Sequence, residues 1–219
     1  MRPVKAFFFH IMTAKRLLII LSAALAFGLL SVSAQNRAQS ADNILSAAVA
    51  KIAQAPAVEA RFTVQAGDGP VQGTILISGQ KYTVATPAMS VWYDGHTQWT
   101  QMHSTTEVCI SEPTADEVME SNPFAILSNY SRKFRCRRLA DVDGRRRVEL
   151  TPLSPDSDIR KAVITIGADD WVAGAQIVYD DGRSVSATVD RIGAARQQPL
   201  SAFRYDRATH PASEIIDLR

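Results

Sequence analysis

The stretch VEARFTVQAGDGPVQGTILIS, residues 58–78, decides the fold class of this chain. Its first half places an apolar side chain at every second position, at Val58, Ala60, Phe62 and Val64. A period of two is typical of a β-strand with one buried face. A turn at Gly67–Pro70 leads into a second alternating run that contains Ile75 and Ile77. Together the two runs predict a pair of antiparallel strands with one face toward water.

The same alternation continues along most of the remaining sequence. It predicts further strands at residues 81–86, 106–111, 133–139, 146–151, 159–166, 172–179, 184–192 and 202–206. A hairpin is predicted around Asp94–Gly95, because this dipeptide between two β-prone runs favours a two-residue turn. Such a turn would place Trp92 and Trp99 on one face of the sheet as diagonal neighbours. The two indoles then either fill an ordinary core or line a cavity.

Helical patterns interrupt the strands at two places. Near the start, residues 44–52 repeat apolar side chains at helical spacing until Pro56 ends the run. Later, Thr114 with Glu117 is a capping box, and Asn122–Pro123 is typical of a helix start. The sequence therefore predicts a mainly β protein of the α+β class, in which about ten antiparallel strands form a strongly curved sheet wrapped over a few helices.

The N-terminus has the pattern of a secretory signal peptide. Lys15 and Arg16 precede the apolar run LLIILSAALAFGLL, and small residues follow up to Ala34. We expect residues 1–34 to be removed and residues 35–219 to form a single domain outside the cytoplasm. The alternative is a retained membrane anchor, for which the apolar run is short.

Two cysteines, Cys109 and Cys136, permit one disulfide in an exported protein. The strand pattern places Cys136 on the same face as Phe134, whereas Cys109 lies opposite to the apolar face of Val108. The pair could approach only if a bulge intervenes. The sequence therefore leaves two alternatives, a disulfide between these cysteines or two buried free thiols.

No pattern in the chain indicates an enzyme. We find no nucleophile set beside a base, no phosphate-binding glycine loop and no ligands at zinc spacing, so we expect no catalysis, metal or cofactor. A formal net charge of +2 argues against nucleic-acid binding. One predicted hairpin is strongly basic, through Arg135, Arg137, Arg138, Arg145 and Arg146. It could dock an acidic protein surface or anionic lipid headgroups, or it could be a solvated face that prevents aggregation.

Several modest motifs follow one another in a defined order. They are Ala60–Phe62 in an alternating strand, Asp94–Gly95 with Trp99, NPFAIL at 122–127, ELTP at 149–152 and a hairpin at Asp181–Arg183. In this order the sequence resembles the LolA family of periplasmic lipoprotein carriers over nearly all of residues 35–219. The resemblance implies an unclosed antiparallel β-barrel of about ten to eleven strands, with helices lidding its concave apolar face. The residues it implies for the acyl-chain cavity and lid are Phe62, Val64, Ile75, Ile77, Trp92, Trp99, Phe124, Ile126 and Leu127.

The function implied by the resemblance is to shelter the acyl chains of lipoproteins between the inner and outer membranes of a Gram-negative bacterium. Its partners would be acylated lipoproteins, an inner-membrane ABC transporter as donor and an outer-membrane acceptor, with the carrier a monomer. The alternative is a LolA-like module that senses lipids or lipoproteins for an envelope regulator. Family carriers have an Arg-Pro pair after the second long strand, whose arginine ties lid to barrel. This chain has Ser78–Lys81 there, so we expect lid control and release to differ.

Overall fold

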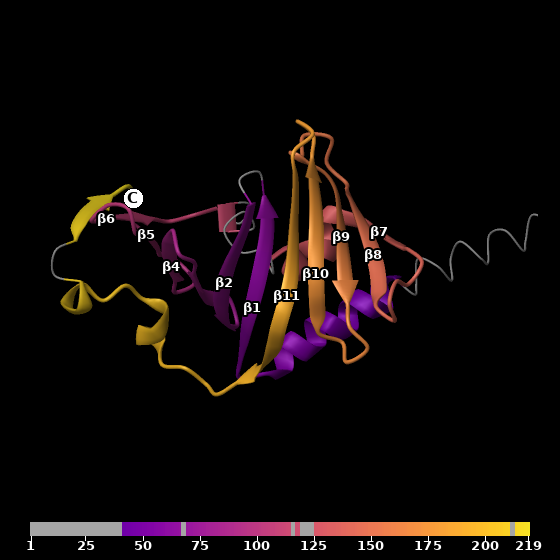
Figure 1. Ribbon diagram of the computed structural model, residues 1–219, viewed down its shortest axis with the longest axis horizontal. Coiled ribbons are helices and arrows are strands. Elements are labelled where there is room, and N and C mark those ends of the chain that lie inside the picture. The colour runs from indigo at the N-terminus through magenta and orange to yellow at the C-terminus, as the bar shows by residue number, and fades with distance from the viewer. Residues whose placement is uncertain (1–40, 67–68, 115–116, 119–124, 211–212) are drawn as a thin grey trace, which may run out of the picture. The chain divides into compact units, whose positions relative to one another are not determined.

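A single twelve-stranded sheet carries the fold, and in the computed structural model this sheet is unclosed and strongly curved (Figure 1). Its strands follow the spatial order β12-β6-β5-β4-β3-β2-β1-β11-β10-β9-β8-β7, so β12 and β7 are its two edges. Their bounds are β1 Ala57–Ala66, β2 Gly69–Ser78, β3 Lys81–Ala85, β4 Met89–Tyr93, β5 Gln98–Met102, β6 Glu107–Ser111, β7 Phe134–Arg138, β8 Arg146–Pro152, β9 Ile159–Ile166, β10 Val172–Tyr179, β11 Ser184–Ala195 and β12 Glu214–Asp217. The predicted mainly β class with an unclosed, curved sheet is confirmed.

The structure describes residues 41–66, 69–114, 117–118, 125–210 and 213–219. The predicted signal peptide, residues 1–34, and Phe124 of the predicted lid lie outside this range. Residues 41–54 are helical, and α3 spans Ala125–Lys133. Two short 3-10 helices, η1 at Leu200–Phe203 and η2 at Arg207–Thr209, follow β11.

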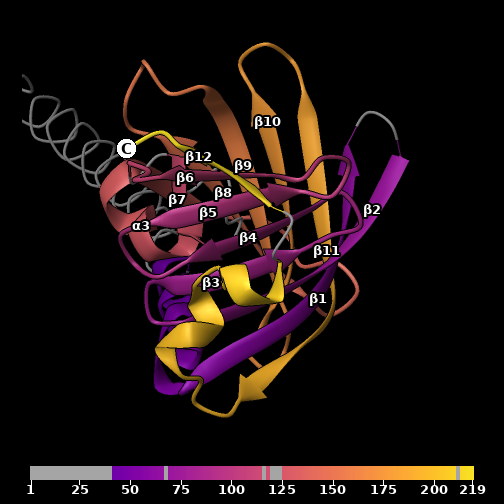
Figure 2. The same ribbon diagram turned by 90° about the vertical axis from the view of Figure 1, so that its left-hand side faces the viewer.

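The main core lies on the concave face of the sheet, against the helix of residues 41–54 and α3. Figure 2 shows how the sheet curls, with β3–β6 in front of β8–β10. The helix of residues 41–54 buries Ile44, Leu45 and Ala48, as its helical spacing predicted. From β1 and β2 the core receives alternate residues, which confirms the period of two: Val58, Ala60, Phe62, Ile75 and Ile77.

The last part of the chain differs from its prediction. The strand expected at residues 202–206 is wrong, because η1 ends at Phe203, whose fully buried side chain packs as a single anchor and not as part of an alternating row. A strand not predicted, β12, pairs with β6 in parallel, so the sheet is not purely antiparallel. The four residues of β12 are too few to show a period, which is why the pattern missed them.

The hairpin between β4 and β5 also differs in register. Trp92 lies directly opposite Trp99 and not diagonally, because Tyr93 pairs with Gln98 and four residues form the loop. The cause is Asp94, whose Oδ1 accepts hydrogen bonds from the backbone N–H groups of His96 at 3.1 Å and Thr97 at 3.0 Å. This arrangement widens the turn beyond two residues. The two indoles still share one face of the sheet, as predicted.

Candidate functional site

An apolar hollow of about 20 Å³ lies beneath α3 on the concave face. One water molecule needs roughly 10–15 Å³ of such space, so an acyl chain does not fit while α3 is in place. The walls come from β1, α3 and the strands β9, β10 and β11. They are Phe62, Leu127, Ile164, Val172, Gly174, Ala175, Ala187 and Val189.

Six of the nine residues expected for the cavity and lid lie together around this core. Phe62 and Leu127 line the hollow itself, and Ile75, Ile77 and Ile126 are buried in the same apolar cluster. Val64 packs against that cluster with its side chain partly exposed. The sequence analysis missed the β10 and β11 walls, although the alternation of those strands carried the signal.

Beside the end of α3 lies a larger groove of about 490 Å³. Its apolar floor includes Ile126, Phe134, Ile159 and Ile177, and its rim carries Arg132, Lys133, Asp156 and Asp158. Leu127 lines the apolar hollow, whereas its neighbour Ile126 lines this groove. One helix therefore borders both a small apolar hollow and a larger groove of the size that small ligands occupy.

A tyrosine joins α3 to the helix of residues 41–54. The hydroxyl groups of Tyr130 and Ser46 are 2.9 Å apart, and the Tyr130 hydroxyl also donates to the backbone carbonyl of Asp42 at 3.5 Å. At the position where family carriers have Arg-Pro, Ser78 Oγ donates to the backbone carbonyl of Pro56 at 3.0 Å. That bond joins β2 to the segment before β1 and does not involve α3. Helix α3 is joined to its neighbour through Tyr130 instead.

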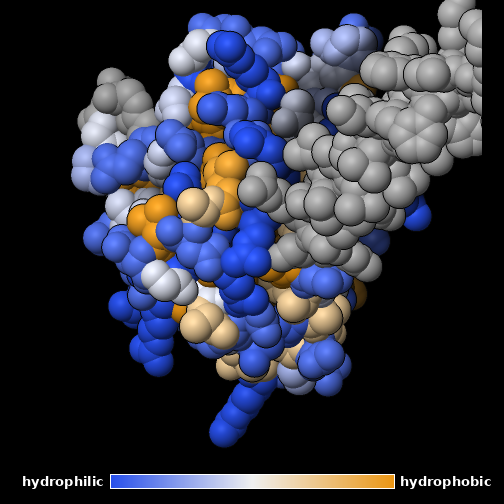
Figure 3. Space-filling model, turned by 90° about the vertical axis from the view of Figure 1, so that its right-hand side faces the viewer, coloured by the Kyte–Doolittle hydropathy of each residue, from blue (hydrophilic) through white to orange (hydrophobic). Residues whose placement is uncertain are grey.

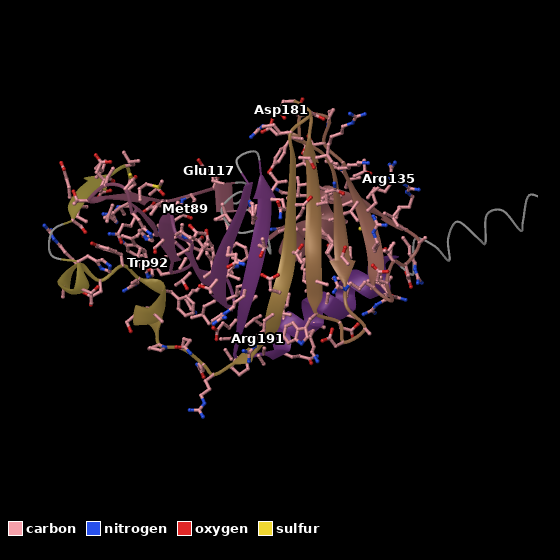
Figure 4. All side chains as sticks on the ribbon, viewed as in Figure 1. Met89, Trp92, Glu117, Arg135, Asp181 and Arg191 are labelled. Atoms are coloured by element: carbon pink, nitrogen blue, oxygen red, sulfur yellow. The ribbon has the colours of Figure 1, made fainter. Side chains whose placement is uncertain are left out.

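Trp92 and Trp99 do not belong to the concave face. Their strand neighbours Val91, Tyr93 and Met89 point into the main core, so alternation directs both indoles to the convex face. There the Trp92 ring lies 5.5 Å from the Tyr205 ring, centroid to centroid, in an edge-on arrangement. Figure 4 shows Trp92 on the side of the sheet near the C-terminal segment. The expectation that the indoles line the cavity does not agree with this placement.

The convex face has its own apolar cluster, which the C-terminal segment (residues 196–210 and 213–219) covers. Phe203 and Val108 are fully buried there, outside the main core cluster. The His210 ring lies 5.3 Å from the Tyr205 ring, and Arg204 Nε donates to Asp94 Oδ2 at 2.8 Å. Burial alone would raise the pKa of Asp94, but hydrogen bonds from Thr97, Arg204 and His96 lower it below its ordinary value.

The disulfide that remained possible is not formed. Cys109 and Cys136 are both free thiols. They stand on β6 and β7, and every other strand except β12 lies between these two in the sheet. Burial, with the nearby Asp42 carboxylate, raises the pKa of Cys136 to about 12 and makes its thiol a weak nucleophile.

The basic hairpin lies at the β7 edge, where hydrophilic residues dominate the surface and apolar ones form small patches (Figure 3). Three of its five arginines are in ion pairs: Arg137 with Glu149, Arg138 with Asp141 and Arg146 with Asp170. Arg135 and Arg145 are exposed, and Figure 4 shows Arg135 at this edge. The patch is therefore partly neutralised by its own neighbours.

The part of the chain that the structure describes holds no group of three or more histidine, cysteine or carboxylate residues arranged for a metal ion. Nor does any helix described there have the length and hydrophobicity of a membrane-spanning segment. What the concave site offers is an apolar wall under a short helix, which suits binding of an apolar group.

Several solved structures are similar to this chain at low sequence identity. A crystal structure of an uncharacterised conserved protein from Thermus thermophilus superposes with a TM-score of 0.56 at 10% identity, over 81% of this chain and 99% of that one. A LolA superfamily protein from Nitrosomonas europaea gives a TM-score of 0.41 at 14% identity, over 75% and 97%. A putative outer membrane lipoprotein-sorting protein domain from Vibrio parahaemolyticus gives 0.44 at 11%, over 76% and 97%.

No curated protein sequence matches the chain. A family model described as outer membrane lipoprotein carrier protein LolA matches residues 30–167. The match covers more than half of the 219 residues, so the chain belongs to the LolA family that its motifs resemble.

Proposed function

We propose that this protein is a periplasmic carrier that holds the acyl chains of lipoproteins against the concave face of its half-barrel and takes them from the inner to the outer membrane. The observation that carries the proposal is the apolar hollow beneath α3, walled by Phe62 and Leu127. Membership of the lipoprotein carrier family supports the interpretation of this hollow as an acyl-chain site. Each buried methylene contributes about 0.8 kcal/mol, so a dry surface is what an acyl chain needs to cross water.

The hollow must enlarge before it can take an acyl chain. Its volume of about 20 Å³ holds little more than one water, whereas the groove on the other side of α3 measures about 490 Å³. Displacement of α3 would join the two spaces, because the helix borders both, through Leu127 and Ile126. Apolar walls of β9, β10 and β11 would then line one continuous site.

The partners and the compartment belong to the same proposal. Acylated lipoproteins are the cargo, an inner-membrane ABC transporter loads them, and an outer-membrane acceptor receives them. Export followed by removal of residues 1–34 would place the carrier in the periplasm. There it would act as a monomer. N-terminal sequencing of the protein recovered from the periplasm tests the export step, and a first residue other than Gln35 would contradict the cleavage site.

Binding of a fluorescent fatty acid tests the carrier site directly. We expect the full chain to bind it at low stoichiometry and Leu127→Glu to weaken binding at least tenfold, because a carboxylate in this wall costs more than about 1.4 kcal/mol. Leu218→Glu is the matched control, since Leu218 is 66% exposed and lines neither the hollow nor the groove. Its binding should equal that of the unmodified chain.

Two results would speak against the carrier. A folded protein that binds no acyl probe would remove the basis of the proposal. A stable complex with a membrane-bound regulator, with no acylated peptide among the co-purified molecules, would favour the sensing module instead. Circular dichroism of each variant shows whether the β-rich fold is intact.

A further inference from the structure

Strand β2 extends beyond its neighbour β3. It pairs with β1 from Gly69 to Ile77, but with β3 only from Thr74 to Ser78. Strand β3 ends at Ala85 because the chain turns there, with Pro87 in the turn and the Thr86 N–H bonded to the Met89 carbonyl at 2.9 Å. Among the described residues, no strand pairs with Gly69–Gly73 on the β3 side. We call this open stretch of edge the β2 notch.

A hollow of about 500 Å³ lies at the β2 notch. Its lining combines one cation and one anion with hydroxyl and amide groups, through Arg61, Asp190, Gln72, Thr74 and Thr86. Asp190 accepts a hydrogen bond from Thr63 Oγ1 at 2.8 Å. Equal numbers of opposite charges, with donors and acceptors between them, suit a neutral chain of amide groups better than a phosphate.

Phe62 is common to this outer hollow and the apolar hollow beneath α3, because it is a lining residue of both. The ring fits only because Gly73 stands directly opposite on β2. A Cβ atom at Gly73 would lie 2.5 Å from Phe62 Cζ, closer than atoms can approach. The polar notch and the apolar hollow are thus adjacent spaces that share one aromatic residue.

We propose that the β2 notch holds the peptide that follows the acylated residue of the cargo, bound as an added strand along Gly69–Gly73. An unpaired strand edge presents backbone N–H and C=O groups to any extended chain, and within Gly69–Gly73 only Pro70 lacks the N–H. At about 3.3 Å per residue, this edge pairs with some five residues of peptide. The acyl chain lies beyond Phe62, in the apolar hollow. The inference rests on the proposed carrier function and adds the polypeptide part of the substrate to it.

The test compares three probes on the full chain. One is an N-palmitoyl hexapeptide, the second the same peptide with alternate backbone nitrogens methylated, and the third palmitoyl ethanolamide, which lacks a peptide. We expect the first to bind about tenfold more tightly than the other two, because two or three additional hydrogen bonds are worth that factor. Hydrogen exchange of the backbone amides in residues 69–74 should slow with the first probe only.

Each outcome decides the proposal. Equal binding of the three probes overturns the notch and leaves the carrier function intact, whereas no binding of any probe overturns both. Slower exchange at β7 or β12 in place of residues 69–74 places the peptide on another edge and also overturns the notch.

A pair of glycine variants provides an independent check. Gly73→Ala should remove most of the gain that the peptide brings, because the new methyl stands in the lining of the notch and so close to the Phe62 ring and the Ala85 carbonyl that its surroundings must shift. Gly193→Ala adds the same methyl to β11, where no atom lies within 4 Å of it, and should leave the gain unchanged. An equal effect of the two variants contradicts the proposal.

Discussion

The two faces of the sheet are covered in different ways. On the convex face, the C-terminal segment buries Phe203 completely and is held by the Arg204–Asp94 ion pair and by β12, which pairs with β6. On the concave face, α3 covers a hollow and is joined to the helix of residues 41–54 through Tyr130. One cover adds a strand to the sheet, and the other only packs against it.

This difference teaches which cover can move. Removing the C-terminal segment would break a ladder of backbone hydrogen bonds and expose an aromatic cluster, whereas moving α3 exposes a few apolar side chains that a ligand can cover again. A cover with few directional bonds belongs to the less stable part of a fold. Under the proposed function, the convex side serves stability and the concave side serves binding.

The largest expected effect is loss of the convex anchor. Phe203→Ala should lower the free energy of unfolding by about 3–5 kcal/mol, because a fully buried aromatic ring is replaced by a cavity. Urea unfolding measures the loss. Fatty-acid binding by the folded variant should stay unchanged, and a parallel loss of binding would show that the two faces are not separate in function.

Leu127→Ala should destabilise the protein by about 2 kcal/mol, at the lower end of the range for buried leucines, because α3 already borders a hollow. The same change should tighten fatty-acid binding, since it enlarges the space beneath the helix. Urea unfolding and probe titration are the two measurements. Weaker binding would mean that Leu127 is a contact of the ligand and not an obstacle to it.

Tyr130→Phe should cost about 1 kcal/mol and make the fatty-acid probe bind faster, because it removes the hydrogen bond from α3 to Ser46. Stopped-flow fluorescence gives the association rate. Ser46→Ala removes the same bond but leaves the one from Tyr130 to the Asp42 carbonyl, so its effect should have the same direction and be smaller. If the double variant is faster than Tyr130→Phe alone, Ser46 does not act through this bond.

The smallest effect concerns pH on the convex face. The pKa of Asp94 is lowered in the folded state, so its ionised form contributes stability above its ordinary pKa of 3.8, and this contribution is lost as pH falls through the folded value. Asp94→Asn should therefore be less stable than the unmodified chain at neutral pH, by less than about 1 kcal/mol because Arg204 is half exposed. The two unfolding curves should converge in acid. A constant difference down to pH 2 would exclude this ionisation.

Sequence periodicity predicted the strands where burial alternates on one face. The bounds of β9 and β10 agree with the prediction residue for residue, because each is a run of eight that ends at turn residues. A period of two could not predict contacts between residues that lie far apart in the sequence. Alternation placed both indoles on one face, but only the three-dimensional path of the chain, which brings Tyr205 and His210 onto Trp92, shows that this face is the convex one.

The site was predicted in part for the same reason. Alternation and the family resemblance identified Phe62 and Leu127 as wall residues, since both are apolar at positions that face the helices. The register of the β4–β5 hairpin depended on side-chain bonds of Asp94, which a turn motif does not contain. The β2 notch depends on the unequal lengths of two neighbouring strands. The one feature of the sequence that indicates it is Pro87, which lies in the turn after β3.

Helix α3 ends at Lys133 and β7 begins at Phe134, so no loop joins them. The position of this junction is held, because Leu153 N–H donates to the Lys133 carbonyl at 2.8 Å and Phe134 is buried. The junction can therefore act as a hinge about which α3 rotates. At 1.5 Å per residue, Leu127 lies about 9 Å from this hinge, so a rotation of about 30° carries it about 5 Å. A rotation of α3 about its junction with β7 would thus enlarge the hollow while the sheet itself stays unchanged.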